Sequence, residues 1–355
     1  MNLIFLGTPQ FAVPTLEALV AEGHTVLAVY TQPDRPKGRG AELAASPVKQ
    51  TSERLGLPIF QPERIRRPDS VEQLRALRPE AMVIVGYGQI IPQSIIDIPA
   101  RGIVNVHASL LPKYRGAAPI QWAIANGETR TGVTTMRIDA GLDTGDMLLK
   151  WETEIDPTET ALDLSPRLAS AGADLLIQTL KGMQDGTIQP EPQDNSQATL
   201  APILKKEDGL IDWNWRARKI FNRTRGFLPW PGAYSHFRGH IFHIWKSRPA
   251  EPVSTEFGYR GPTGQLGPHG SSGDPGEPGS PRNDPAGLGH DTSAFAGVPH
   301  PGQLFPEKKR LFIACGEGTT LEALEVQIEG RKRMPIEAFL NGQRLDENEI
   351  LGEES

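Results

Sequence analysis

An asparagine and a histidine, Asn105 and His107, lie two positions apart at the end of one predicted strand, Gly102–Val106. Side chains two positions apart share one face of a strand, so both would face a common ligand if the strand persists. An asparagine amide can donate a hydrogen bond to a developing oxyanion, and histidine can carry a proton at neutral pH. The pair indicates charge stabilisation and proton transfer, or, alternatively, a structural histidine at a strand end.

A second polar segment, Asp139–Met147, holds three aspartates and two glycines between two further predicted strands. This composition is typical of a tight turn with an exposed backbone. If one of its carboxylates reaches His107, it would fix the imidazole ring and favour the cationic form. The alternative is an acidic surface turn without a function.

The elements that must position these residues alternate between strand and helix. Helical segments are predicted from Pro14 to Glu22 and around 48–55, 71–77 and 119–125. This alternation predicts βαβ units and a mostly parallel sheet, in which ligands bind at the carboxyl ends of the strands. Pro166 predicts that the next helix, within 161–181, begins at or near that residue. The predicted strands are 3–6, 25–30, 81–85, 102–106, 131–136 and 147–151.

The second half of the chain has a different pattern, with short β-like runs at 234–237, 240–245, 311–314 and 320–326. We expect an α/β protein with an N-terminal Rossmann-like, mostly parallel sheet domain and a C-terminal small β-barrel, OB-like, domain with a disordered Gly/Pro-rich insertion. The expected boundaries are 1–186 for the first domain, 187–204 for a linker, 205–345 for the barrel with its insertion at 254–302, and 346–355 for an acidic tail.

Glycine recurs at every third position from Gly258 through residue 281, which gives eight Gly-X-Y triplets. That period is the signature of a collagen triple helix, whose axis admits only glycine. A disordered, polyproline-like loop is the interpretation we favour, because the triplets are few and both ends must return to one small domain. The segment contributes to the high total of 37 Gly and 32 Pro among 355 residues.

Cysteine and histidine usage exclude several kinds of site. A single cysteine, Cys315, rules out an internal disulfide and a Cys-rich zinc site, and we expect it to be buried and inert. His240 and His243 would point to opposite faces of a strand, and with His236 they lack a completing acid or thiol, so we expect no metal.

Hydropathy and charge limit the location and the partners. No apolar run approaches the ~18 residues of a membrane span. The net charge of −6 argues against a uniformly DNA-coating surface. We therefore expect a cytoplasmic monomer that binds neither membrane nor DNA.

The residues around His107 and Asp143 carry a family resemblance. The stretch Asn105–Trp122, followed by the Gly141–Met147 turn, resembles the 10-formyltetrahydrofolate-dependent formyltransferases. Three more segments, Gly7–Ala12, Thr31–Gly40 and Pro229–Ala233, are similar to the methionyl-tRNA formyltransferases within that superfamily. The resemblance spans about residues 1–250 and resumes over 302–345.

The resemblance implies the transfer of a formyl group from 10-formyltetrahydrofolate, a co-substrate, to the α-amine of methionine on initiator Met-tRNA, giving formylmethionyl-tRNA for translation initiation. It implies that Asn105, His107 and Asp143 are catalytic: the first two stabilise the oxyanion, and the aspartate holds His107 and helps to pass protons. The implied folate-contacting residues are Ser109, Leu110, Leu111 and Pro112, with Tyr87, Gly88 and Ile90 on the pterin side.

Basic residues gather where an RNA would bind. Residues 205–250 carry ten basic and three acidic residues, which predicts a phosphate-binding strip or, alternatively, a solvated charged face. The resemblance also implies that the 33–40 loop inserts by the acceptor stem, with a weaker grip here because the residues after Gly40 are less basic than in many relatives. The predicted RNA contacts are Arg35, Lys37, Arg39, Lys205, Lys206, Arg223 and Arg225.

Two other functions fit parts of the sequence. A formyltransferase acting on a nucleotide-sugar amine or a small ribonucleotide amine would share the catalytic trio, but would not need the basic second domain. A noncatalytic RNA- or folate-binding protein would share the fold, but would not need an intact trio.

Overall fold

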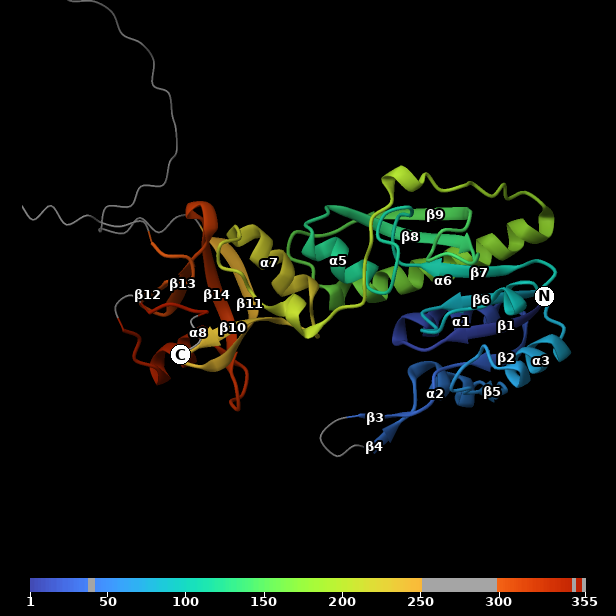
Figure 1. Cartoon of the computed structure of the whole chain (residues 1–355), viewed down its shortest axis with the longest axis horizontal. Helices are drawn as coiled ribbons and strands as arrows, with labels where there is room; N and C mark the ends of the chain where they lie inside the picture. Colours follow the sequence, from blue (N-terminus) through green and yellow to red (C-terminus); the bar gives the residue numbers. More distant parts are fainter. Residues whose placement is uncertain (38–41, 251–298, 347–348, 353–355) are drawn as a thin grey trace, which may run out of the picture.

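Two sheets, one in each half of the chain, organise the structure (Figure 1). The computed structural model describes residues 1–37, 42–250, 299–346 and 349–352. The Gly-X-Y repeat at 258–281 and nearly all of the predicted 254–302 insertion lie outside the described residues, as do Arg39 and half of the predicted 346–355 tail.

The N-terminal sheet has seven strands in the order β5-β2-β1-β6-β7-β8-β9. The first five are parallel to one another, and β8 and β9 join antiparallel at one edge. The predicted mostly parallel sheet is therefore confirmed. The strands are β1 (Asn2–Gly7), β2 (Thr25–Tyr30), β5 (Ile59–Phe60), β6 (Ala81–Val85), β7 (Ile103–His107), β8 (Arg130–Arg137) and β9 (Met147–Glu154), beside a small hairpin of β3 (Arg35–Lys37) and β4 (Glu42–Ala44).

Helices cover both faces of this sheet, because its strands carry apolar residues on both sides. In β1, Leu3 and Phe5 belong to the core beneath α1 and α6, whereas Ile4 and Leu6 belong to the core beneath α3 and α4. The helices of this half are α1 (Val13–Ala21), α2 (Pro47–Arg54), α3 (Pro68–Ala76), α4 (Gln93–Ile96), α5 (Pro119–Ala125) and α6 (Ala161–Asp185).

The start of α6 corrects one prediction. We expected a start near Pro166, but α6 begins at Ala161 and passes through the proline. The Thr160 hydroxyl accepts a hydrogen bond from the Asp163 backbone N–H at 3.3 Å, and the Asp163 carboxylate accepts one from the Thr160 N–H at 3.1 Å. This capping box fixes the first turn ahead of the proline, which then removes only one backbone hydrogen bond from a 25-residue helix.

The C-terminal sheet is antiparallel, in the order β10-β11-β14-β13-β12, with β15 paired to β14. The predicted separate β unit is thus confirmed. Cys315 lies buried in its core, and burial raises the pKa of this thiol to about 12, as expected for an inert cysteine. The strands are β10 (Ala233–Phe237), β11 (His240–Ala250), β12 (Leu304–Glu307), β13 (Arg310–Ala314), β14 (Thr320–Ile328) and β15 (Met334–Pro335).

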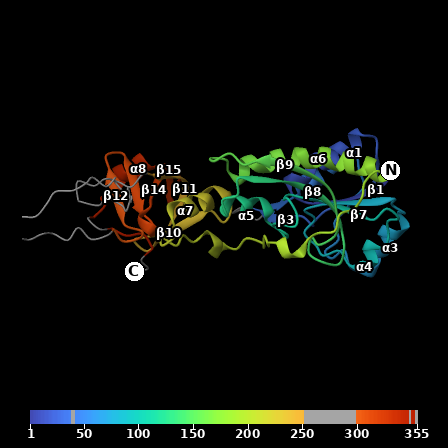
Figure 2. The same cartoon turned by 90° about the horizontal axis from the view of Figure 1, so that it is seen from above.

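Two helices of this half were not predicted, α7 (Ala217–Gly226) and α8 (Ile336–Gly342). Ile220 and Phe221 of α7 face the C-terminal core. On its other side α7 packs against α5, which joins the two halves of the molecule (Figure 2). Short 3₁₀ turns lie at Gln10–Ala12, Asn195–Gln197, Lys206–Gly209 and Gly316–Gly318.

The predicted linker, 187–204, lies against the N-terminal sheet for part of its length. Glu191 pairs with Met147 at the start of β9, and Leu200 pairs with Arg115. Within the described residues, no helix combines the length and the apolar character that crossing a membrane requires.

Candidate active site

Strand β7 carries Asn105 and His107 on one face. The alternating residues Val104 and Val106 belong to the core on the opposite face. Asn105 and His107 are 7% and 5% exposed, and His107 is the last residue of the strand. Both side chains thus lie at the carboxyl end of a parallel strand, where open α/β sheets bind ligands.

Asp143 reaches this pair from the turn between β8 and β9. One carboxylate oxygen lies 3.6 Å from His107 Nδ1, and the other lies 3.5 Å from Asn105 Nδ2. The strongest contact of the carboxylate is a 2.8 Å hydrogen bond from the Gly116 backbone N–H. The three residues predicted to be catalytic are therefore brought together, with Asn105 and His107 buried and Asp143 half-buried.

The hydrogen bonding of His107 defines its proton positions. Nε2 lies 2.8 Å from the backbone carbonyl oxygen of Tyr114. A carbonyl oxygen only accepts, so Nε2 carries a proton and donates it. Nδ1 is then the nitrogen that gains or loses a proton, and it faces the Asp143 carboxylate. A proton on Nδ1 would lie beside that carboxylate.

Two glycines allow the chain to approach this closely. Gly116 has a φ of 122°, and a Cβ there would lie 2.6 Å from the Ala201 carbonyl oxygen. At Gly145 a Cβ would lie 2.0 Å from the carbonyl oxygen of Arg137. Any side chain at either position would displace the backbone that holds Asp143.

The loop after β7 turns two of its predicted folate-contacting side chains inward. Ser109 Oγ donates to the Lys113 carbonyl oxygen at 2.6 Å, and Leu111 is 1% exposed. Thr134 of β8 holds the loop by donating to the Ser109 carbonyl at 2.7 Å. Leu110 and Pro112 are half-buried. A folate contact at Ser109 or Leu111 would therefore come from the backbone.

In the 87–90 loop, too, a residue predicted to contact folate has its side chain turned inward. The Tyr87 ring is 1% exposed and packs in the core beneath α3 and α4, and burial raises the pKa of its hydroxyl. Its backbone carbonyl accepts hydrogen bonds from Thr8 and Gln32, both at 3.1 Å. Gly88 is exposed, and Ile90 is 84% exposed. The predicted pterin contacts would thus involve the backbone and Ile90, not the tyrosine ring.

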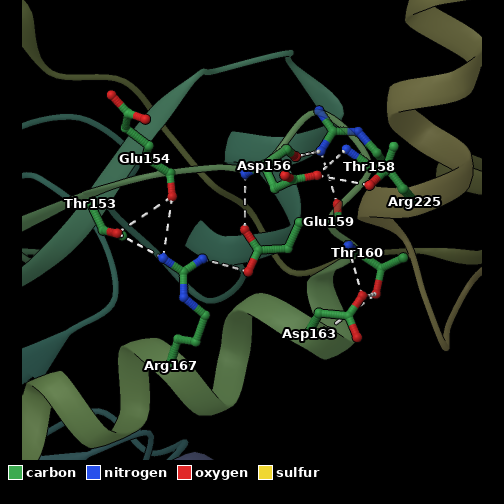
Figure 3. A network of polar contacts seen from close by, with 9 residues as sticks. All are labelled: Thr153, Glu154, Asp156, Thr158, Glu159, Thr160, Asp163, Arg167 and Arg225. Carbon is green, nitrogen blue, oxygen red and sulfur yellow. Dashed lines mark hydrogen bonds and ion pairs between the residues drawn. The ribbon is translucent and has the colours of Figure 1, made fainter.

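Arg225 was predicted to contact RNA, but the structure buries it between the two halves of the molecule (Figure 3). The side chain is 7% exposed, and one of its nitrogens donates to the Glu159 carbonyl oxygen at 2.9 Å. Two others donate to Asn222 Oδ1 at 3.2 Å and 3.1 Å. Because this guanidinium is withdrawn from solvent, we remove Arg225 from the predicted RNA surface.

The other predicted RNA contacts differ in their surroundings. Arg35, Lys205 and Lys206 are exposed. Arg223 is half-buried: it donates to the Asp208 carbonyl at 2.9 Å and lies over the Trp215 ring, 4.4 Å from the centroid. For Lys37 the structure describes the backbone, in β3.

In the part of the chain that the structure describes, no three or more His, Cys, Asp or Glu side chains are grouped to hold a metal ion. His243 stacks on Trp245 with 5.3 Å between ring centroids, and burial lowers the pKa of this histidine.

The sequence did not reveal the groups in neighbouring segments that hold Asn105, His107 and Asp143 in place. The Gly116 N–H and the Tyr114 carbonyl are backbone groups, which carry no residue-type signal. Gln193 donates to the backbone carbonyls of Asp143 and Gly145, yet it stands in a polar, proline-containing segment that resembled a linker.

Known proteins resemble this chain over nearly its whole length. The sequence model described as formyl transferase matches residues 1–180, and the model described as formyl transferase, C-terminal domain, matches residues 203–344. The chain belongs to the formyl transferase family. This formyl transferase is 58% identical over 353 residues to the methionyl-tRNA formyltransferase of Solibacter usitatus (strain Ellin6076), covering 99% of each chain. It is 49% identical over 353 residues to that of Koribacter versatilis (strain Ellin345), again covering 99% of each.

Solved structures show the same fold at lower identity. An N-formyltransferase from Helicobacter canadensis, in complex with folinic acid and dTDP-3-aminofucose, aligns with a TM-score of 0.59 and 17% identity. The alignment covers 90% of this formyl transferase and 98% of that chain. At this identity, the likeness establishes the shared fold and nothing finer.

Proposed function

We propose that this enzyme transfers the formyl group of 10-formyltetrahydrofolate to the α-amine of methionine on initiator Met-tRNA, yielding formylmethionyl-tRNA for translation initiation. The observation that carries the proposal is the cluster in which Asp143 lies within 3.6 Å of both Asn105 and His107. Relatives named methionyl-tRNA formyltransferase that match 99% of the chain support the choice of acceptor.

The bonds and the proton of this reaction can be accounted for with these three side chains. The neutral amine attacks the formyl carbon, a new C–N bond forms, and negative charge develops on the formyl oxygen. Asn105 and His107 donate to that oxygen. When the bond between the formyl carbon and N10 breaks, a proton leaves the attacking nitrogen and N10 gains one. Asp143 is the group that passes this proton, directly or through water.

The distances in the cluster suit this sequence of events. At 3.5 Å the contact between Asn105 Nδ2 and Asp143 is longer than an ordinary hydrogen bond, so Asn105 gives up no strong contact when it turns toward an oxyanion. His107 Nδ1, 3.6 Å from Asp143, can donate to the oxyanion while Nε2 keeps its 2.8 Å hydrogen bond to the Tyr114 carbonyl. Asp143, by contrast, keeps its 2.8 Å hydrogen bond from Gly116 and stays fixed. Catalytic hydrogen bonds are often long before substrate binds.

Folate would bind beside this cluster, where the loops after β6 and β7 offer backbone groups. Parallel strands place both loops at the same edge of the sheet, next to His107. Pterin carries several donors and acceptors on a flat ring, which suits recognition by backbone N–H and C=O groups. The folinic acid in the Helicobacter canadensis complex supports this choice of co-substrate.

The tRNA would contact exposed basic residues of the C-terminal half. Lys205 and Lys206 precede α7, and Arg218 and Lys219 lie exposed on it. These residues replace Arg225 in the proposed phosphate-binding strip, together with the 33–40 loop for the acceptor end. We also propose that the enzyme acts as a cytoplasmic monomer, without membrane or DNA partners.

A formylation assay tests the proposal. The purified enzyme is given 10-formyltetrahydrofolate with initiator Met-tRNA, with a nucleotide-sugar amine, or with a small ribonucleotide amine. We expect formylation of Met-tRNA, and for the two small amines a kcat/KM lower by at least ~10³-fold. A higher kcat/KM with either small amine would overturn the assignment of the acceptor.

A further inference from the structure

The turn that carries Asp143 is held in place by Gln193. Gln193 Nε2 donates to the backbone carbonyl oxygens of Asp143 and Gly145, both at 2.8 Å. Asp143 has a φ of 51°, a left-handed conformation that is unfavourable for a residue with a side chain. The preceding Leu142 is 62% exposed. A surface turn with an unfavourable backbone conformation needs contacts from other segments of the chain to keep it in position.

Arg115 sets the orientation of the Gln193 carboxamide. Gln193 Oε1 accepts hydrogen bonds from Arg115 Nε at 3.0 Å and from a terminal nitrogen at 2.8 Å. The oxygen of the amide therefore faces the guanidinium, and the nitrogen must face the two carbonyls. Arg115 is itself 7% exposed, and it also donates to Asn195 Oδ1 at 2.8 Å.

The segment that contains Gln193, residues 191–201, also contacts the loop on the other side of the catalytic cluster. Arg115 N–H donates to the Thr199 carbonyl at 2.9 Å, and Ala201 N–H donates to the Arg115 carbonyl at 2.7 Å. The neighbours of Arg115 are Tyr114, whose carbonyl binds His107, and Gly116, whose N–H binds Asp143. Residues 191–201 thus connect the two loops whose spacing determines where the Asp143 carboxylate lies.

We propose that Gln193 is a positioning residue for formyl transfer. It holds the backbone on either side of Thr144, so that the Asp143 carboxylate remains within reach of Asn105 and His107. Gln193 lies outside the reacting groups and acts through Asp143. The inference rests on the proposed function, because it takes Asp143 to be catalytic.

Two substitutions test the role of the Nε2 donors. Gln193→Met keeps the length of the side chain and removes its hydrogen bonds, while Gln193→Glu keeps an acceptor for Arg115 and removes the N–H groups. We expect both to lower kcat by about 10–100-fold, with KM for Met-tRNA and for 10-formyltetrahydrofolate within about twofold of wild type. The matched control is Gln197→Met, because Gln197 Nε2 donates to the carboxylate of Asp194 in its own segment, at 2.8 Å. It should keep wild-type kcat.

A double-mutant cycle separates positioning from a general structural role. If Gln193 acts through Asp143, Gln193→Met should change kcat by less than about twofold in an Asp143→Ala background, measured in single turnovers. A further tenfold loss in that background, with a lower melting temperature, would show a structural role and overturn the inference.

The outcomes also distinguish this inference from the proposed function. Wild-type turnover in Asp143→Ala or His107→Ala would refute the catalytic assignment itself. An inactive Asp143→Ala beside wild-type kcat in both Gln193 variants would refute the positioning role alone.

Discussion

At Asp143, contacts from three separate parts of the chain meet on one residue. Its carboxylate faces β7 and accepts the Gly116 N–H, and its backbone carbonyl accepts a hydrogen bond from Gln193. The proposed proton carrier is therefore held through both its carboxylate and its backbone. Such preorganisation lets a site stabilise developing charge without first rearranging.

Removing either proposed oxyanion donor should abolish most activity and leave the fold intact. Asn105→Ala and His107→Ala each delete one donor, which typically costs about 10²–10³ in kcat. Formylation of Met-tRNA measures the loss, and circular dichroism checks the fold. A purified, folded His107→Ala enzyme with near-wild-type turnover would contradict the catalytic assignment.

Among the elements, α7 joins the halves of the molecule through Arg225. The guanidinium donates to the Glu159 carbonyl (Figure 3) and also to Asn222 Oδ1, and both of these residues are buried. Arg225→Met keeps much of the volume and leaves these acceptors unpaired, so we expect it to lower the free energy of unfolding by about 1–3 kcal/mol.

Urea denaturation measures this loss, and a neighbouring arginine provides the control. Arg218 is exposed on the same helix, so Arg218→Met should change the free energy of unfolding by no more than about 0.5 kcal/mol. Equal losses in the two variants would mean that the buried hydrogen bonds of Arg225 contribute little.

Three neighbouring strands of the C-terminal sheet share an ion-pair cluster around Glu322. The carboxylate of this residue, on β14, is 3% exposed and binds Arg310 of β13 at 2.8 Å and Arg248 of β11 at 2.6 Å. Hydrogen bonding from Arg310, followed by that from Arg248, lowers the pKa of Glu322 to about 2. A lowered carboxylate pKa stabilises the fold above its unfolded value of 4.5, and that stability is lost as pH falls toward about 2.

Glu322→Gln should therefore reduce the acid sensitivity of the protein. Between about pH 5 and about pH 3, the wild type should lose about 1–2 kcal/mol more unfolding free energy than the variant, allowing for the exposed arginines. Urea titrations at the two pH values measure the difference. Glu325→Gln, on the same strand with a side chain 30% exposed, is the control and should retain the wild-type pH dependence more closely. Identical pH dependence in wild type and Glu322→Gln would refute the prediction.

The helices and strands also show which features could be predicted from the sequence. The strand that carries Asn105 and His107 was predictable because its apolar run is a local signal, and the Asp143 turn was found through its motif. The start of α6 was misplaced because Pro166 was weighed without the Thr160 capping box. The roles of Gln193 and Arg225 were missed because their partners lie 48–50 and 66 residues away in the chain.

At the scale of the whole molecule, the chain leaves and re-enters the C-terminal sheet at one end. Ala250 of β11 and Ala314 of β13 both pair with Thr320 of β14, and the Ala314 N–H donates to the carbonyl of Gln303, just before β12. Three interstrand steps separate Ala250 from Gln303, a distance of about 14 Å at ~4.8 Å per step.

Deleting residues 257–301 should therefore leave the enzyme active. The six remaining residues, 251–256, can span about 20 Å, which exceeds the gap. We expect kcat/KM for Met-tRNA within about twofold of the full chain, because shortening the connection between two strands changes the closure entropy little. A drop of more than about tenfold, in a deletion variant that melts like the full chain, would assign the segment a part in catalysis or in tRNA binding.

The short distance between Ala250 and Gln303 also makes the connection between them a suitable place for a fluorescent label. A reporter domain whose own termini lie close together could be inserted between them without forcing the sheet apart. Because Asp143 and its partners lie in the other half of the molecule, such a reporter would follow the C-terminal half while the proposed catalytic cluster stays unmodified. Fluorescence from that position could then time the arrival of tRNA separately from the transfer of the formyl group.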